Sequence, residues 1–270
     1  MSDKALGDKI PEFGKKNAGG GGGASSAGLG GLTGGVSIQS TRELVAIIAV
    51  AVFIIGGAEL LLRVLEVPQY ILPTPSSVVA VFFGSDIPVI GQHFGYTLIE
   101  LFAGYAIGAS IGMLLAAVIT QFPFAEKIIA PYILLLVTTP MLALVPLLIL
   151  NFGFGFAPRI IAVALASGPM VMINSAIGFR RVDLGKIALA RPYGATTLQI
   201  FTKIRIPMAM PMVIVRLMMG AIFGLITAVG AEMAGGGFGL GSRLTTYSLV
   251  IRMPEFFACA LILSMVGILI

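Results

Sequence analysis

The chain has 270 residues, of which 57% are apolar and only 11% are charged. A soluble domain carries about 25% charged residues, and one of this size could not bury so much apolar surface in a single core. The composition therefore excludes an ordinary soluble protein and predicts an all-α, polytopic membrane helix bundle. The net charge of +5 could indicate nucleic-acid binding, but the basic residues cluster at the ends of apolar runs, as in membrane proteins.

Residues 1–40 differ in composition from the rest of the chain. Four lysines precede a glycine run at 19–23, and Gly/Ser-rich sequence of this kind behaves as a flexible coil. No apolar core follows until residue 44, so the pattern of a cleaved signal peptide is missing. We expect a disordered cytoplasmic tail over 1–40 and a transmembrane permease domain over 41–270.

Six apolar runs in the second segment approach the roughly 20 residues that a helix needs to cross a bilayer. The sixth run is short by about a turn, and the chain is expected to end inside that helix. The predicted spans are 44–62, 97–119, 128–150, 160–177, 208–231 and 256–270.

Two features stand out before the middle of the chain. Pro73 and Pro75 forbid a continuous helix after the first span, and Ser76 or Ser77 can cap a short amphipathic helix over 78–83. In the second span, glycines recur at every fourth position, so they share one face on which another helix can approach closely. These glycines are Gly104, Gly108 and Gly112.

The third span is interrupted by Pro131, Pro140 and Pro146. Such breaks survive in a membrane where neighbouring helices or water satisfy the freed carbonyl groups. The span is therefore our main candidate for lining a permeation path, and kinks that serve packing alone are the alternative.

Few ionisable residues lie within the spans, and some of them are candidates for the permeation path. Glu100 lies near the outer end of the second span, where an interfacial position is the alternative. Arg216 lies roughly 13 Å along a helix from Pro207, so it can snorkel only partly and can pair with a carboxylate. The candidate translocation path comprises Pro140, Glu100, Arg216 and Glu232.

The longest polar interval, 179–207, carries six basic residues between the fourth and fifth spans. The positive-inside rule places this loop, and with it the N-terminus, on the cytoplasmic face. Asp183 can cap a first short helix that Pro192 ends, while Thr196 with Gln199 forms a capping box for a second. The second helix carries an apolar face that must pack on its own membrane helices or on a partner. That face consists of Ile200, Phe201 and Ile204.

The spacing within this loop resembles a known family. Gly194, nine residues and then Ile204-Arg205-Ile206-Pro207 fit the EAA-loop signature of ABC importer permeases. The acidic residue of that signature is missing, because Ala188-Leu189-Ala190 stands where the family has Glu-Ala-Ala, and Pro192 is a second departure. Further segments are similar to the nitrate, sulfonate, taurine and bicarbonate branch: 72–76, Thr97-Leu98 with Gly104, Ala190-Arg191 before Gly194-Ala195, Ala231-Glu232-Met233 and 239–241.

The resemblance implies a mechanism with several partners. The loop would form a coupling helix that docks on a pair of separate ATPase subunits, which hold ATP; this chain lacks a Gly-x-x-x-x-Gly-Lys-Ser/Thr motif. A second permease chain, expected to be identical, and a solute-binding protein would complete the importer in the bacterial inner membrane. The solute would be a small oxyanion such as a sulfonate, nitrate or an organic acid. The implied docking residues are Ala188, Ala190, Arg191, Gly194, Ala195, Ile204 and Pro207.

Two other classes of function stay open. A secondary transporter or channel would work without an ATPase and would need intramembrane coupling residues. An intramembrane enzyme would need paired carboxylates, a histidine cluster or a nucleophile with a base. His93 and Cys259 are the only residues of their types, so we expect no catalytic site, no bound cofactor and no metal site. The glycine-rich segment 235–241 lacks the strand-turn-helix context of a phosphate cradle.

Overall fold

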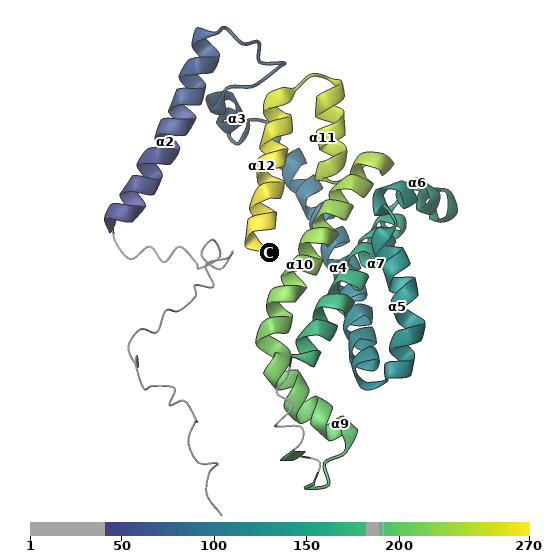
Figure 1. The fold of residues 1–270 in the computed structure, drawn as a ribbon. Coiled ribbons are helices and arrows are strands. Elements are labelled where there is room, and N and C mark those ends of the chain that lie inside the picture. The colour runs from purple at the N-terminus through teal and green to yellow at the C-terminus, as the bar shows by residue number, and fades with distance from the viewer. Residues whose placement is uncertain (1–40, 182–188, 191) are drawn as a thin grey trace, which may run out of the picture. The chain divides into compact units, whose positions relative to one another are not determined.

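The computed structural model describes residues 41–181, 189–190 and 192–270, and among these residues no β-strand occurs. The described chain consists of helices joined by short turns (Figure 1). The predicted all-α class is therefore confirmed. The chain divides into two compact units, residues 1–54 and 55–270, and the features below belong to the second unit.

Four helical segments of the described chain are long and apolar enough to cross a membrane. They are α2 (Thr41–Val64), α4 (Ile87–Gln121), α7 (Phe156–Arg180) and a continuous run formed by α9 (Thr197–Ile200), the π-helical turn η1 (Phe201–Arg205) and α10 (Ile206–Gly235). The shorter helices are α3 (Pro75–Val81), α11 (Leu240–Leu249) and the apolar α12 (Met253–Leu269).

The predicted third span is not one helix. It forms α5 (Pro123–Thr138) and α6 (Met141–Phe152), which meet at an angle of 93° and can together count as a fifth, broken span. Pro140 stands at the break, whereas Pro131 and Pro146 lie inside helices. Thr139 Oγ1 donates a hydrogen bond to the Leu135 carbonyl at 2.7 Å, and the Thr139 amide donates to the same carbonyl at 3.1 Å, so both donors of Thr139 turn back onto α5 at the break. A total of six spans stays a prediction.

Helix α7 is the central element, because α4 and α10 both pack along it. Gly104, Gly108 and Gly112 of α4, which we call the glycine ridge, lie directly on α7. A Cβ atom at Gly108 would come within 3 Å of the Ala164 backbone and of Ser167 Oγ, and one at Gly104 or Gly112 would meet α7 as closely. The close approach predicted from the four-residue glycine spacing is therefore confirmed.

The short helix α3 begins earlier than expected and has a different cap. Thr74, not Ser76 or Ser77, is the N-cap residue, and its hydroxyl accepts a hydrogen bond from the Ser77 amide. The Ser76 amide donates instead to the Glu59 carboxylate of α2 at 2.9 Å. Three hydroxyl residues lie within 74–77, and the contact of Ser76 with Glu59 leaves Thr74, directly before Pro75, as the cap.

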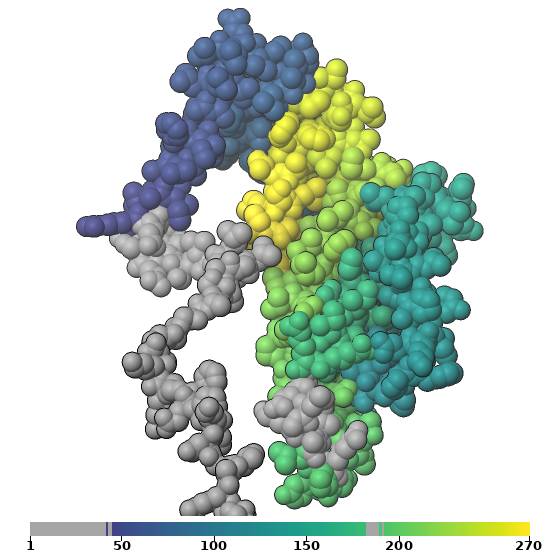
Figure 2. Space-filling view, in the orientation of Figure 1, coloured from purple at the N-terminus to yellow at the C-terminus, as the bar shows by residue number. Residues whose placement is uncertain are grey.

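Within residues 55–270, α9 lies at one end and α11 at the other (Figures 1 and 2). An apolar cluster at the α9 end includes Phe179, Phe201 and Val213, and the Phe179 and Phe201 rings lie 5.3 Å apart. A second cluster near α11 includes Ile90, Leu240 and Cys259. The polar groups described next lie between and beside these clusters.

Candidate functional site

A buried ion pair connects α4 to the start of α7. Arg159 is 2% exposed and Glu100 is fully buried, and Arg159 Nη1 donates to Glu100 Oε1 at 2.9 Å. Helix packing encloses Glu100 within the protein, whereas its interfacial depth in the membrane stays a prediction. Sequence analysis did not single out Arg159. Its position ahead of a long apolar run resembles that of any flanking basic residue, so no local signal identified it.

The glycine-rich segment after α10 folds over this ion pair. Arg159 Nη1 donates to the Phe238 carbonyl at 2.9 Å, Nη2 donates to the Gly236 carbonyl, and the guanidinium lies 4.2 Å from the Phe238 ring centroid. Gly236, Gly237 and Gly239 have positive φ angles of 62°, 87° and 93°, which side-chain-bearing residues rarely adopt. The glycines therefore let the backbone turn its carbonyl groups toward Arg159.

Glu232 binds the same segment from the end of α10. It is fully buried, and its Oε2 accepts a hydrogen bond from the Gly241 amide at 2.7 Å. On α4, Thr97 Oγ1 accepts from the Leu240 amide at 2.9 Å. We call Glu100, Arg159, Glu232 and residues 236–241 the glycine clamp. The clamp fixes α4, α7, α10 and α11 to one another, and it is no phosphate cradle, because its inward groups bind side chains of the same chain.

The glycine clamp brings two of the predicted path residues together, since Glu100 and Glu232 both belong to it. His93 lies beside it, buried, with Nδ1 at 3.2 Å from the Gly239 carbonyl. Among the described residues, no group of three or more His, Cys, Asp or Glu side chains could hold a metal ion. The glycine clamp thus connects α4, α7, α10 and α11 through buried hydrogen bonds and one ion pair.

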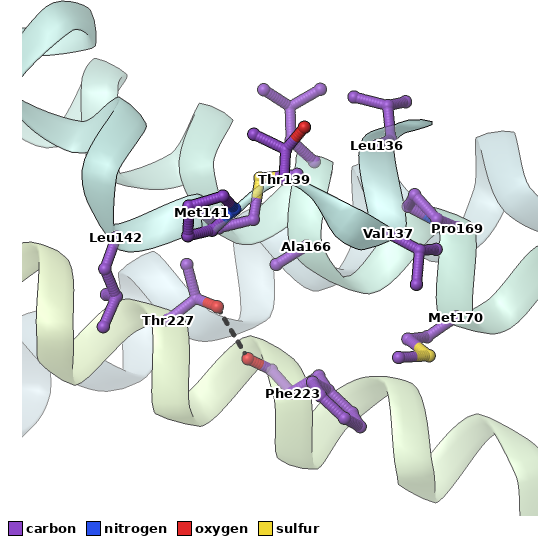
Figure 3. A pocket seen from close by; sticks show the side chains of 12 residues that line it. Leu136, Val137, Thr139, Met141, Leu142, Ala166, Pro169, Met170, Phe223 and Thr227 are labelled. Atoms are coloured by element: carbon purple, nitrogen blue, oxygen red, sulfur yellow. Dashed lines mark hydrogen bonds between the residues drawn. The ribbon is translucent and has the colours of Figure 1, made fainter. Parts of the chain in front are cut away.

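Pro140 lies elsewhere, in a cavity of about 280 Å³ at the bend between α5 and α6. Figure 3 shows side chains from both of these helices and from α7 and α10 around it. We call this cavity the bend pocket. None of its twelve lining residues is charged: Leu136, Val137, Thr139, Pro140, Met141, Leu142, Leu165, Ala166, Pro169, Met170, Phe223 and Thr227.

Arg216 does not pair with a carboxylate among the described residues. Its Nη1 donates to Asn174 Oδ1 of α7 at 2.9 Å, and both side chains are partly buried. The expectation that Arg216 pairs with a carboxylate is thus wrong for the described chain. An amide side chain holds the guanidinium without neutralising its charge.

The predicted docking residues lie at the α9 end, with two exceptions. Ala188 and Arg191 lie outside the described residues, as does Asp183, the expected cap of the first loop helix. The Thr196–Gln199 capping box is confirmed, because both reciprocal hydrogen bonds are present. Gly194 has a positive φ of 77°, and Pro207 stands in the first turn of α10. Ala190, Ala195 and Ile204 pack partly buried against the apolar cluster.

The predicted apolar face of the second loop helix packs on the membrane helices, and two apolar side chains outside that face stay exposed. Ile200 and Phe201 are buried against the membrane helices, whereas Leu198 is 72% exposed and Tyr193 is 90% exposed. A hollow beside Tyr193 is lined by Gly194, Gln199 and Lys203, among others. Packing on the chain's own helices therefore accounts for Ile200 and Phe201 and leaves an exposed apolar surface beside them.

The chain matches a known protein family. Residues 108–270 match the family model described as binding-protein-dependent transport system inner membrane component. The chain is 30% identical over 203 residues to SsuC of Bacillus subtilis (strain 168), which is named as an aliphatic sulfonates transport permease; 73% of this chain and 72% of SsuC are covered. The SsuC protein of Escherichia coli (strain K12), with the same description, is 33% identical over 174 residues, which cover 63% and 65% of the two chains.

Two solved structures have a similar fold. One is described as inward facing conformations of the MetNI methionine ABC transporter, with a TM-score of 0.56, 18% identity and coverage of 68% of this chain and 89% of that chain. The other is a crystal structure of an amino acid ABC transporter with histidines, with a TM-score of 0.56, 21% identity and coverage of 68% and 87%. At these identities the likeness concerns the fold.

Proposed function

The chain belongs to the family of binding-protein-dependent transport system inner membrane components, and we propose that it couples to a separate ATPase through residues 180–207. It is a multi-pass membrane protein and the permease subunit of an ABC importer. A permease of this kind moves a solute without changing it chemically, so we propose no catalytic activity for the chain.

The observation that carries the docking proposal is the exposed apolar surface at the α9 end. Leu198 and Tyr193 remain exposed although Ile200 and Phe201 of the same short segment are buried. Burying a side chain such as Leu198 contributes about 1.5–3 kcal/mol, so a partner that covers this surface gains binding energy. The remaining docking positions are proposed from their place in the signature: Ala188, Ala190, Arg191, Gly194, Ala195, Ile204 and Pro207.

We propose that ATP is held by the ATPase pair and that no cofactor binds this chain. The α9 end then faces the cytoplasm, as the six basic residues of 179–207 favour. Together with the tail lysines, the same rule supports an N-terminus on the cytoplasmic side of the bacterial inner membrane. A second, identical permease chain and a solute-binding protein complete the importer, and no nucleic acid is involved.

The solute is proposed to be a small oxyanion, because two relatives are named for aliphatic sulfonates. Its path runs past Pro140 in the bend pocket and past Arg216. Glu100 and Glu232 border this path from the opposite end of α10, where the glycine clamp ties the helices together. The glycine clamp could therefore act as a gate on the solute path, because opening the path at that end would require α4, α7, α10 and α11 to separate.

Replacing Leu198 by Gln tests the docking surface. We expect Leu198→Gln to weaken ATPase binding at least about tenfold, because an apolar anchor of about 1.4 kcal/mol or more is lost. The measurement is titration of the purified permease with its ATPase, together with ATP hydrolysis stimulated by the binding protein. Leu249→Gln is the matched control: Leu249 is 78% exposed but lies at the end of α11, at the opposite end of the unit.

Equal ATPase affinity of Leu198→Gln and Leu249→Gln would contradict docking on α9. Solute uptake that persists without any ATPase, driven by an ion gradient alone, would contradict the importer as a whole. That second outcome would instead support a secondary transporter or channel.

A further inference from the structure

Arg216 is a cation inside a membrane-spanning helix, and the described residues do not neutralise its charge. It lies ten residues after the start of α10, which is about 15 Å along the helix. Its one described partner is the neutral side chain of Asn174. Ionisable groups at such depth are costly unless they face a partner or a wet cavity, and they commonly mark solute pathways. Whether Arg216 faces a cavity therefore decides whether it can contact a solute.

Helical spacing places Arg216 on the same face of α10 as the bend pocket. Phe223 lies seven residues after Arg216 and Thr227 four residues further, and both line the pocket; residues at these separations share one helix face. The side of α10 that carries Ile214, Met218 and Ala221 lines a different cavity. Arg216 thus lies on the pocket side of α10, about two turns nearer the α9 end.

Contacts of helix α7 also place Arg216 on the side of the bend pocket. Met170 lines the bend pocket, and Asn174 follows it by one turn, with Asn174 Nδ2 donating to the Met170 carbonyl at 2.9 Å. That hydrogen bond orients the amide so that its Oδ1 accepts from Arg216. The Arg216–Asn174 pair therefore continues the strip of α7 and α10 that lines the pocket.

The bend pocket itself offers an apolar surface without charge. Its polar side chains are Thr139 and Thr227, and both hydroxyls donate to carbonyls of their own helices. Met170 of α7 and Phe223 of α10 both line the pocket and are labelled in Figure 3. A volume of about 280 Å³ is at the small end for ligand cavities and suits a short aliphatic or small aromatic body.

We propose that the bend pocket and the Arg216–Asn174 pair form one recognition site for a monoanionic organic solute. The apolar body of the solute lies in the pocket against Met170 and Phe223, and its anionic group binds the Arg216 guanidinium, whose planar fork suits oxyanions. Asn174 is a positioning residue that aims the guanidinium. The inference rests on the proposed function and adds the class of solute: an anion with an apolar body, in preference to a bare inorganic oxyanion.

Butane-1-sulfonate is the probe that tests this site. The full-length permease with its ATPase, in phosphatidylcholine nanodiscs, is titrated calorimetrically with butane-1-sulfonate, with butan-1-ol, which lacks the charge, and with sulfate, which lacks the apolar body. We expect the sulfonate to bind at least about tenfold more tightly than either, because only it gains both the charge-assisted hydrogen bonds and the apolar burial.

Substitutions separate the two halves of the site. Arg216→Met should weaken butane-1-sulfonate binding at least about tenfold, Asn174→Leu should weaken it about threefold, as expected for lost positioning, and Arg216→Lys should retain part of the affinity through its charge. Lys127→Met is the matched control, because it removes an exposed positive charge at the start of α5. Size-exclusion profiles of all variants confirm that folded protein is being compared.

Three results would overturn the site. They are butane-1-sulfonate failing to bind the wild-type chain, the Arg216→Met variant binding it as tightly as Lys127→Met, or butan-1-ol or sulfate binding as well as the sulfonate. The importer is tested separately in the same sample. Sulfonate binding without any ATPase coupling would overturn the proposed function alone, whereas intact coupling with binding that ignores Arg216 would overturn the site alone.

Discussion

Replacing Arg159 by Met should destabilise the chain by about 3–5 kcal/mol, because a buried carboxylate would lose its cation. Glu100 is fully buried and pairs with Arg159 at 2.9 Å. The same change also removes the donors to the Phe238 and Gly236 carbonyls, so the glycine clamp loses its central contact. Thermal unfolding of the purified chain in detergent, followed by far-UV circular dichroism, measures the effect.

Two companion variants identify the cause. Glu100→Gln combined with Arg159→Met should recover part of the lost stability, because the unpaired charge is removed together with its partner. Arg252→Met removes an Arg whose ion pairs with Asp86 and Glu255 are solvent-exposed, so it should cost no more than about 1 kcal/mol. If Arg159→Met proved as stable as Arg252→Met, the buried pair would not hold the clamp together.

Replacing Gly108 by Leu should prevent α4 and α7 from packing at their present distance. Even the first side-chain atom at this position would come within 3 Å of the Ala164 backbone and of Ser167 Oγ, and backbone atoms cannot move aside as a flexible side chain can. We expect a loss of about 3 kcal/mol or more, at the upper end for overpacked cores. The midpoint of thermal unfolding and the fraction of monodisperse protein measure it.

Gly95→Leu is the matched control within the same helix. A Cβ atom at Gly95 would have nothing within 4 Å, and replacing a glycine inside a helix usually adds a little stability. Stability should therefore stay the same or rise slightly. Equal losses for Gly95→Leu and Gly108→Leu would mean that the glycine ridge is not what sets the distance between α4 and α7.

Local patterns carried most of what sequence analysis predicted correctly. Apolar run length indicated a membrane bundle, four-residue glycine spacing indicated the α4–α7 contact, and Thr196 with Gln199 indicated a capping box; each depends on residues within a few turns of one another. The resemblance read from Gly194 to Pro207 is confirmed by the family match over 108–270.

The polar sites could not be predicted, because their members are far apart in the chain. Glu100 and Arg159 are separated by 59 residues, and Asn174 and Arg216 by 42. A glycine-rich segment has no side chains from which to infer a partner, so its role as a cover for Arg159 required the fold. Of the three prolines predicted to interrupt the third span, Pro140 stands at the break and the other two lie inside helices. The angle of 93° between α5 and α6 depends on tertiary packing.

The uninterrupted helical run of 39 residues, Thr197–Gly235, joins the α9 surface to the glycine clamp. At 1.5 Å per residue its length along the helix is about 60 Å, and the π-helical turn η1 lies close to α9, where the run bends (Figure 1). Because one continuous helical run connects α9 with Glu232, we expect a displacement of α9 to be transmitted to the glycine clamp. Helix α7 packs along α10 between these two ends. A tilt of the run about α7 would therefore move the α9 surface and the glycine clamp in opposite directions.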